Sequence, residues 1–363
     1  MLQPRKTLTN NPNCNLKNFR RLLRTGSSYG KNNGEDDEEE PNIRLYKSRG
    51  QHLLTNPRIL DSIVRTSEIK PDDTVLEIGP GTGNLTLKLL EVAKKVVAVE
   101  VDKRMVEILH KRVTERGLQH RLNVISGDAL KTEFPEFNLV VANIPYNISS
   151  PLLAKLVFGA KANPFRSATL LLQKEFARRL LAKPGETEYN RLAVNVKLMA
   201  EVEFIMDVSK RDFVPCPKVD SSVVKIYPKS KIPDVNLKEW WAFTRTCFSK
   251  KNKTLGATFK QKKKLIELMK LSKVEGLCGD GNGKCLGYDN NGDEECTSDM
   301  SSELFKGKVI SVIESGGFSD KRPSKLSNDE LLQLLSLFNE AGIYFHDHKR
   351  SSNAYDAACD DLL

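Results

Sequence analysis

Four consecutive residues, Asn143-Ile144-Pro145-Tyr146, could together hold an amine that is attached to a flat ring. The side-chain oxygen of Asn143 and the carbonyl of Ile144 are two acceptors for the two hydrogens of such an amine. Pro145 restricts the backbone and would fix the direction of that carbonyl, while Tyr146 can stack on the ring. The pattern predicts an amine clamp that turns the nitrogen lone pair toward an electrophile. The alternative is an ordinary turn from strand to helix.

The clamp follows an apolar stretch, "FNLVVAN", that reads as a buried strand. From Pro41 to about Pro228, such stretches alternate with helical patterns, which predicts a parallel, doubly wound sheet. Sheets of this kind bind ligands at the carboxyl ends of their strands. Ligand-binding residues are therefore also expected after the preceding strands.

A glycine turn follows the first of these strands, in "DTVLEIGPGTGNLTLKLL". The predicted strand covers 74–78, and Gly79, Gly81 and Gly83 precede a helix. Glycines let the backbone approach a ligand closely, and the start of the helix presents free N–H groups. A dinucleotide fingerprint would need its third glycine at position 84, which is Asn84, so NAD and FAD are disfavoured. The pattern G-x-G-x-G after Glu77 is typical of S-adenosylmethionine (SAM) methyltransferases.

Two further strands end in acidic residues that suit the same cofactor. Glu100 ends the apolar part of "KVVAVEVD", where a carboxylate can accept both ribose hydroxyls. Asp128 follows the strand in "LNVISGDAL" and could accept a hydrogen bond from the adenine amine. Either residue alone could be a surface charge, but their agreement with the glycine turn favours a cofactor site.

The sequence resembles the ribosomal RNA adenine dimethyltransferases over about residues 44–260. The resemblance rests on "SRGQHLL", "EIGPGTGNLT", "VVAVEVD", "SGDAL", "ANIPYNISSPL", "LLLQKEFARRL" and "FVPCPKVDSSVV", in that order. It implies an α/β, Rossmann-like SAM-dependent methyltransferase fold with a small C-terminal helical domain. It also implies N6,N6-dimethylation of two adjacent adenosines near the 3′ end of small-subunit rRNA.

The resemblance also assigns site residues. Those expected to contact the cofactor are His52, Leu54, Gly79, Gly81, Glu100, Asp128 and Asn143. Those expected at the reacting base are Asn143, Ile144, Pro145, Tyr146 and Phe213, with the ring of Phe213 sandwiching the base opposite Tyr146. His52 stands where many bacterial members have Asn, and its ring nitrogens can still form hydrogen bonds. No metal is expected.

The net charge of +10 and the pI near 9.1 favour a polyanionic partner. Residues 245–264 contain eight basic residues and no acidic one, which suits phosphate contacts on one helical element. A plain solvated face is the alternative. The residues expected to bind RNA are Lys218, Lys250, Lys251, Lys253, Lys260, Lys262, Lys263 and Lys264. We expect a monomer that acts on small-subunit rRNA or on a pre-ribosomal particle.

Composition divides the chain into three parts. Residues 1–40 read as a basic targeting segment and an acidic linker, 41–229 as the methyltransferase domain, and 230–363 as a helical RNA-binding domain. Residues 1–34 lack Asp and Glu, which favours a mitochondrial transit peptide over a basic RNA-contacting tail. Nucleolar and plastid locations remain alternatives. A disordered acidic insertion is expected at about 276–302, and its spacing fails the EF-hand pattern.

Two other functions compete with RNA methylation. The first is a ribosome-assembly or mitochondrial transcription factor that binds RNA with little need for catalysis. The second is a methyltransferase for free amines, which the basic segment disfavours. The seven cysteines contain no C-x-x-C pair, so they indicate neither a disulfide framework nor a zinc site. No apolar run approaches the roughly 18 residues that a membrane span needs, so no membrane partner is expected.

Overall fold

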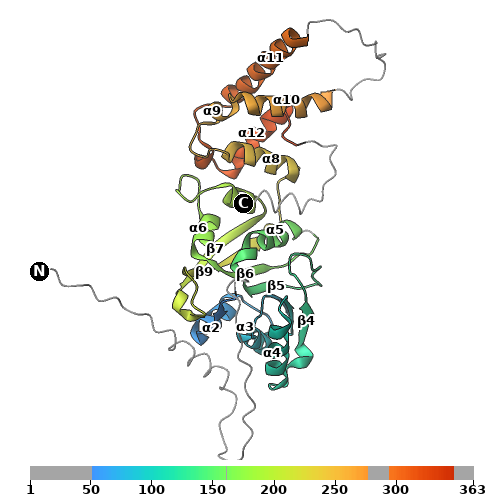
Figure 1. Cartoon of the computed structure of the whole chain (residues 1–363), viewed down its shortest axis with the longest axis vertical. Helices are drawn as coiled ribbons and strands as arrows, with labels where there is room; N and C mark the ends of the chain where they lie inside the picture. Colours follow the sequence, from blue (N-terminus) through green and yellow to red (C-terminus); the bar gives the residue numbers. More distant parts are fainter. Residues whose placement is uncertain (1–50, 161, 277–293, 347–363) are drawn as a thin grey trace, which may run out of the picture. The chain divides into compact units, whose positions relative to one another are not determined.

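The computed structural model describes residues 51–160, 162–276 and 294–346, which form two compact units (Figure 1). Among them, the sheet unit comprises 51–152, 162–177 and 203–227, and the helical unit comprises the rest. The chain enters the helical unit for good at Pro228, close to the expected boundary at 230. However, the helical unit also takes 153–160 and 178–202, which the sequence analysis placed in the first domain. Residues 1–50 and 347–363 lie outside the described part.

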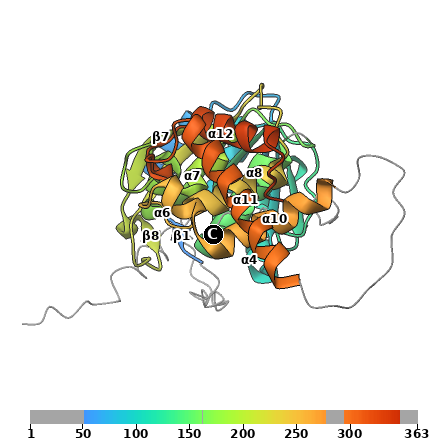
Figure 2. The same ribbon diagram turned by 90° about the horizontal axis from the view of Figure 1, so that it is seen from above.

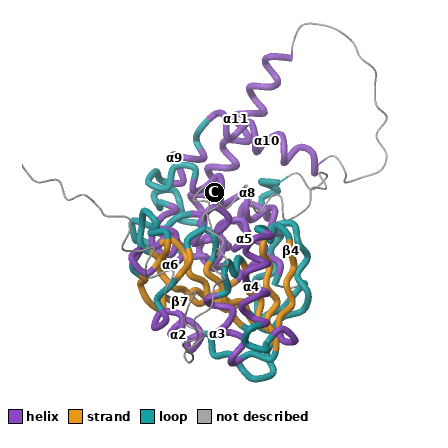
Figure 3. The backbone as a smooth tube through the Cα atoms, turned by 60° about the horizontal axis from the view of Figure 1, so that its bottom comes forward, coloured by secondary structure: helices purple, strands orange, loops and turns teal. Residues whose placement is uncertain are grey.

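The sheet unit is built on seven strands in the order β4-β3-β2-β5-β6-β9-β7. Figure 3 shows these strands in orange, with β4 and β7 labelled at the two edges. The first five of these pair in parallel, which confirms the expected α/β fold. β9 pairs antiparallel with β6, so the sheet is mixed rather than wholly parallel as predicted. The strands are β2 (Thr74–Ile78), β3 (Lys95–Glu100), β4 (Leu122–Ser126), β5 (Leu139–Asn143), β6 (Ser167–Gln173), β7 (Ala200–Val208) and β9 (Ser221–Pro228).

Three helices pack on this sheet or on one another: α2 (Pro57–Thr66), α3 (Asn84–Val92) and α4 (Lys103–Thr114). α2 packs on α3, α3 on β3, and α4 on β3 and β4. Polar caps start two of them, because the side chains of Asn56 and Asp102 accept hydrogen bonds from the first turns of α2 and α4. A short 3-10 helix, η3 (Tyr146–Ile148), follows β5 after two intervening residues.

A short antiparallel pair brings the two ends of the sheet unit's sequence together. β1 (Leu53–Leu54) pairs with β8 (Phe213–Val214), so that Leu54 lies opposite Phe213. Two helices begin in the sheet unit and continue in the helical unit, α5 (Ser149–Gly159) and α6 (Lys174–Leu181). The β1–β8 pair therefore sets where the segment before Leu53 lies relative to the strand ends.

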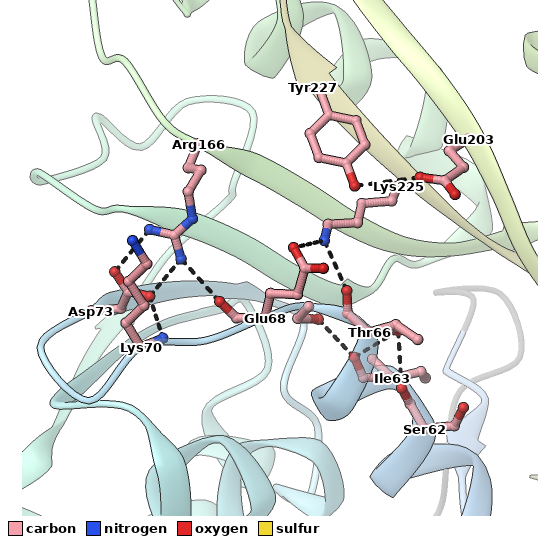
Figure 4. A network of polar contacts seen from close by, with 11 residues as sticks. Ser62, Ile63, Thr66, Glu68, Lys70, Asp73, Arg166, Glu203, Lys225 and Tyr227 are labelled. Carbon is pink, nitrogen blue, oxygen red and sulfur yellow. Dashed lines mark hydrogen bonds and ion pairs between the residues drawn. The ribbon is translucent and has the colours of Figure 1, made fainter.

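A polar network anchors the carboxyl end of α2 to β9 (Figure 4). Lys225 is 2% exposed, and its ammonium donates to the Thr66 carbonyl at 2.9 Å and to Glu68 at 2.8 Å. Burial alone would lower the pKa of Lys225, but its hydrogen bonds, first that with Glu68, outweigh burial and raise it. Arg166 forms two hydrogen bonds with the carboxylate of Asp73. The hydrogen bond from Lys225 satisfies the Thr66 carbonyl, which the end of α2 leaves open.

The helical unit is a bundle of helices (Figure 2). Aromatic rings form part of its core. α7 packs against α8 and α12, and α11 packs against α9, α10 and α12. The rings of Phe243, Phe259, Phe338 and Phe345 lie with centroids 5.0 to 6.3 Å apart. The helices are α7 (Arg191–Met199), α8 (Leu237–Phe248), α9 (Leu255–Phe259), α10 (Lys262–Gly276), α11 (Glu294–Ser315) and α12 (Asn328–Glu340).

Ser327 and Glu330 form a capping box at the start of α12. α11 begins at Glu294, inside the range 276–302 where a disordered insertion was expected, so the part of that range from 294 onward is helical. Most of the expected loop, 277–293, lies outside the described residues. No helix in the described part is long and apolar enough to cross a membrane.

Candidate cofactor and base-binding site

The glycine turn after β2 packs closely on two other segments. Gly79 has φ +65°, and a Cβ placed there would lie 3.2 Å from the ring of Pro145. Gly81 has φ +57°, and its Cβ would lie 2.7 Å from the side chain of Leu53. Both the positive φ and the close approach demand glycine. The turn thus packs directly on Pro145, just after β5, and on Leu53 in β1, with no room for a side chain on either glycine.

Glu100, at the end of β3, is held by backbone N–H groups. One carboxylate oxygen accepts from Gly81 at 3.1 Å and the other from Asp102 at 2.9 Å. Burial raises the pKa of Glu100, and these two hydrogen bonds act in the opposite direction. A carboxylate has about four lone-pair sites, so both oxygens can still accept hydroxyl hydrogens. The geometry fits the expected contact with two ribose hydroxyls.

Asp102 links β3 to the segment before β1. Its carboxylate accepts from Gln51 at 2.9 Å and forms an ion pair with Arg104 at 2.5 Å. The hydrogen bond from Arg104 is the main reason why the pKa of Asp102 falls to about 2. Asp102 therefore stays ionised over the whole physiological range and holds Gln51 beside the glycine turn.

Two adjoining cavities collect the residues expected to bind the cofactor. A small cavity of about 80 Å³ is lined by His52, Leu54, Gly79, Gly81, Glu100 and Asn143, among others. A neighbouring cleft of about 420 Å³ adds Asp128 and Gly127 and shares Gly79, Glu100 and Pro145 with the first. The structure thus brings together every residue that the sequence analysis assigned to the cofactor.

Val101 also lines both cavities, although the sequence analysis did not select it. Its side chain is 60% exposed, which is unusual for a valine next to a buried strand. An apolar surface between Glu100 and Asp128 suits the face of a flat ring such as adenine. The sequence signal that could have indicated Val101 is its position between two acidic residues, Glu100 and Asp102, at the end of a predicted strand.

Asn143 is oriented by the backbone of the β1 segment. Its Nδ2 donates a hydrogen bond to the carbonyl of His52 at 3.0 Å. An atom that faces a carbonyl must be a donor, so this bond also fixes the position of the side-chain oxygen. Ile144 is 1% exposed, and its N–H donates to Leu171 on β6 at 3.3 Å. The backbone at the clamp is therefore tied to the neighbouring strand.

The ring of Tyr146 is held from two sides. Its hydroxyl is 2.7 Å from that of Ser221, and its ring stacks on His52 at a centroid distance of 5.7 Å and an interplanar angle of 27°. His52 Nδ1 lies 2.7 Å from the carbonyl of Pro215, so this nitrogen carries the hydrogen and donates it. Burial raises the pKa of Tyr146, which keeps the phenol neutral.

Phe213 does not lie where the sequence analysis placed it. Its side chain is 0% exposed and belongs to the hydrophobic core of the sheet unit. In the conformation described, its ring therefore cannot stack on a base opposite Tyr146. The pairing of β8 with β1 explains the difference, because the alternation of side chains along β8 turns Phe213 inward. The aromatic ring found against Tyr146 is that of His52.

Glu77 is a titratable residue of the site that was not selected as a binding residue. It lies in β2, lines the small cavity and is 1% exposed. Burial raises its pKa to about 8, with a further contribution from the charge of Glu100. The carboxyl of Glu77 therefore holds its proton at neutral pH.

The basic segment 245–264 is not one helical element as predicted. It runs through the end of α8, a turn, α9 and the start of α10. Lys264 pairs with Glu267 at 2.9 Å, whereas Lys250, Lys253, Lys260, Lys262 and Lys263 are exposed. Lys251 is half-buried, and Lys218 is exposed in the sheet unit.

The close approach at Gly79 generates a prediction about cofactor binding. Gly79→Ala should weaken SAM binding at least about 10-fold, because the new Cβ would displace Pro145 and with it the clamp. Gly117→Ala is the matched control, since Gly117 has φ +68° but no atom within 4 Å of the added Cβ. Gly117→Ala should lose about 1 to 2 kcal/mol of stability, because alanine is strained at a positive φ, and Gly79→Ala should lose at least as much. Equal SAM affinities by calorimetry for the two variants would contradict this account of the turn.

The raised pKa of Glu77 predicts a dependence of stability on pH. The folded protein binds this proton up to about pH 8, whereas the unfolded chain releases it near pH 4.5. The stability of the wild type therefore falls relative to Glu77→Gln as the pH rises from 5 to 8. Urea denaturation at three pH values measures the difference in free energy of unfolding between the wild type and Glu77→Gln. Glu91→Gln, which alters an exposed carboxylate, serves as the control. A difference in free energy of unfolding that does not change with pH would show that the pKa of Glu77 is not raised in the folded protein.

Comparison with known proteins agrees with this geometry. The family model described as "Ribosomal RNA adenine dimethylase" matches residues 42–277. An Arabidopsis thaliana protein named "Ribosomal RNA small subunit methyltransferase, mitochondrial" is 63% identical in an alignment of 320 positions that covers 86% of this chain and 84% of that protein. A crystal structure of a dimethyladenosine transferase from Plasmodium falciparum has a TM-score of 0.70 at 41% identity, over 81% of this chain and 100% of that chain. The chain therefore belongs to the ribosomal RNA adenine dimethylase family.

Proposed function

We propose that this protein uses SAM to dimethylate the N6 atoms of two adjacent adenosines near the 3′ end of small-subunit rRNA. The observation that carries the proposal is the hydrogen bond from Asn143 to the His52 carbonyl, because it fixes an amide oxygen at the end of β5. Family membership and the named relatives support the substrate class. The activity would contribute to ribosome biogenesis.

The residues present fit the cofactor. Glu100, with its two backbone N–H partners, would hold the ribose, and Val101 with Asp128 would hold the adenine. When bound, SAM supplies an electrophilic methyl group. Gly79, Gly81, Leu54 and His52 shape the wall of the small cavity around it.

The clamp addresses the weak nucleophilicity of the adenine amine. The lone pair of this nitrogen is delocalised into the ring, and no side chain can deprotonate the neutral amine at neutral pH. Hydrogen bonds from the amine to the Asn143 oxygen and the Ile144 carbonyl favour a pyramidal nitrogen. The lone pair of a pyramidal nitrogen is no longer delocalised into the ring and can accept the methyl group. Tyr146, held by Ser221, stacks on a base that has been taken out of its helix.

A second methyl transfer requires that the clamp accept the monomethylated base. That base keeps one N–H, which one of the two acceptors can bind while the methyl group lies beside the other. The same residues therefore serve both steps, with cofactor exchange between them. A role limited to RNA binding, as in an assembly or transcription factor, would need none of this polar geometry.

We also propose a mitochondrial location. The mitochondrial relative at 63% identity and the acid-free start of the sequence support it. A second Arabidopsis thaliana relative, at 46% identity, is named without a compartment, so the nucleolus and the plastid remain alternatives. A fluorescent fusion of residues 1–40 tests whether this segment directs import.

The amide of Asn143 provides the test of the proposed activity. Asn143→Ala should lower methyl transfer to immature small-subunit particles at least about 100-fold, because the amine loses one of its two acceptors. Asn143→Asp should be equally impaired, since a carboxylate cannot donate to the His52 carbonyl. The readout is dimethyladenosine in digested RNA, quantified by mass spectrometry.

Asn163→Ala is the matched control, because the Asn163 amide also donates to backbone carbonyls, those of Phe134 and Pro135, but outside the site. It should retain wild-type activity. Dimethyladenosine formed at the wild-type rate by Asn143→Ala would refute the clamp. An inactive wild type that binds RNA tightly would instead favour the assembly or transcription factor.

A further inference from the structure

The carboxyl of Glu77 is a buried group to which the proposed reaction assigns no part. Glu77 lies in β2, two residues before Gly79, and its side chain is 1% exposed. The residue lines the small cavity around the expected cofactor, and its Oε2 has no hydrogen-bond partner within the described part of the chain. Burying a polar atom without a partner costs free energy. An unpartnered oxygen at the wall of a ligand cavity therefore points to a partner that arrives with the ligand.

The groups packed around Glu77 disfavour its ionised form. Burial is the main reason why its pKa rises to about 8, and the charge of Glu100 at the end of β3 adds to this effect. The hydroxyl of Thr86, on α3, acts in the opposite direction, although its Oγ1 forms no hydrogen bond with the described residues. The other titratable groups that line the cavity are His52 and Tyr146. Neither of these two side chains is a permanent cation.

Two cations on neighbouring helices are engaged elsewhere. Lys88, on α3, forms an ion pair with Asp61 at 3.0 Å. Arg112, on α4, reaches the glycine turn, where its guanidinium donates to the carbonyl of Thr82 and to the side chain of Asn84. No cation of the described chain contributes to the pKa of the buried carboxyl in β2. A positive charge beside that carboxyl must therefore come from a ligand.

The expected cofactor changes its charge during the reaction. SAM carries a positive sulfonium, whereas its product, S-adenosylhomocysteine, has a neutral thioether in the same place. In a cavity walled by buried strand residues, two charges interact more strongly than they do in water. A cation close to a carboxyl favours the ionised form of that carboxyl. The sulfonium thus opposes the effect of burial on Glu77, and the thioether does not.

We propose that Glu77 distinguishes the methyl donor from the spent product through its proton. The carboxyl releases this proton to solvent when the sulfonium binds, and it takes one up again when the neutral thioether is left in the site. The inference rests on the proposed function for the identity of the cofactor. Glu100 cannot make this distinction, because the ribose hydroxyls that it would bind are the same in both molecules.

A residue of this kind suits an enzyme that transfers two methyl groups in succession. After the first transfer, the product must leave and a new donor must bind before the second transfer can occur. An ionised Glu77 attracts the donor, whereas the product would leave the same carboxylate buried and unpaired. The site therefore binds the donor more tightly than the product, which favours the exchange.

The test counts protons by calorimetric titration of the full-chain protein in two buffers with different heats of ionisation. At about pH 7, the wild type should release at least about 0.5 proton more per SAM than Glu77→Gln does. With S-adenosylhomocysteine, the two proteins should release the same number. Glutamine has the shape of a protonated glutamic acid but cannot ionise, so the comparison separates Glu77 from any titration of the ligand itself.

Affinities measured in the same titrations provide a second readout. The SAM affinity of the wild type, divided by that of Glu77→Gln, should rise about 10-fold between about pH 6 and pH 8, because ligand binding that releases a proton strengthens as the pH rises. The same ratio for S-adenosylhomocysteine should stay constant. Glu77→Asp keeps an ionisable group and should recover part of the pH dependence. Glu91→Gln, at an exposed carboxylate, should match the wild type throughout.

The possible outcomes separate this inference from the proposed function. Equal proton release on SAM binding by the wild type and Glu77→Gln would overturn the inference. An excess of protons that is the same for SAM and S-adenosylhomocysteine would also overturn it, because Glu77 would then respond to a group that both ligands carry. If the wild type releases the proton with SAM but forms no dimethyladenosine in small-subunit particles, the proposed function fails while the role of Glu77 stands. If the wild type binds neither ligand, both fail.

Discussion

The hydrogen bond between Asn143 Nδ2 and the His52 carbonyl is the contact on which the site depends. It joins the end of a central strand to a segment 91 residues earlier in the chain, and it decides which side of the amide faces the base. The pairing of β1 with β8 holds that segment in position from one side, and the ion pair of Asp102 with Arg104 holds it from the other through Gln51. Each of these contacts therefore helps to fix the side-chain amide of Asn143, and this amide in turn positions the reacting nitrogen.

Backbone groups do most of the positioning on the cofactor side. Two N–H groups fix the carboxylate of Glu100, and two glycines with positive φ allow the turn to touch Pro145 and Leu53. Because the backbone of a buried sheet is rigid, little reorganisation remains when a ligand binds. In the free protein, the carboxyl of Glu77 beneath the turn holds its proton at neutral pH, so it adds no negative charge beside Glu100.

Elements marked by a pattern of apolar and polar residues within one continuous segment could be predicted from the sequence. β2 begins and ends at the residues expected from its apolar pattern, and Glu100, Asp128 and Asn143 all lie where strand ends were predicted. Features that depend on contacts between distant segments were not predictable in this way. The inward orientation of Phe213 follows from the register of β8 with β1, and the exposure of Val101 follows from a cavity.

The central claim is that Asn143 and Ile144 together hold the amine of an adenine. The most direct measurement is a structure of the protein with S-adenosylhomocysteine and an RNA fragment that contains the target adenosines. The account predicts that N6 lies within about 3.2 Å of both Asn143 Oδ1 and the Ile144 carbonyl oxygen, with Nδ2 still bonded to His52. A bound adenine whose N6 contacts neither oxygen, or an Asn143 amide turned away from the His52 carbonyl, would contradict it.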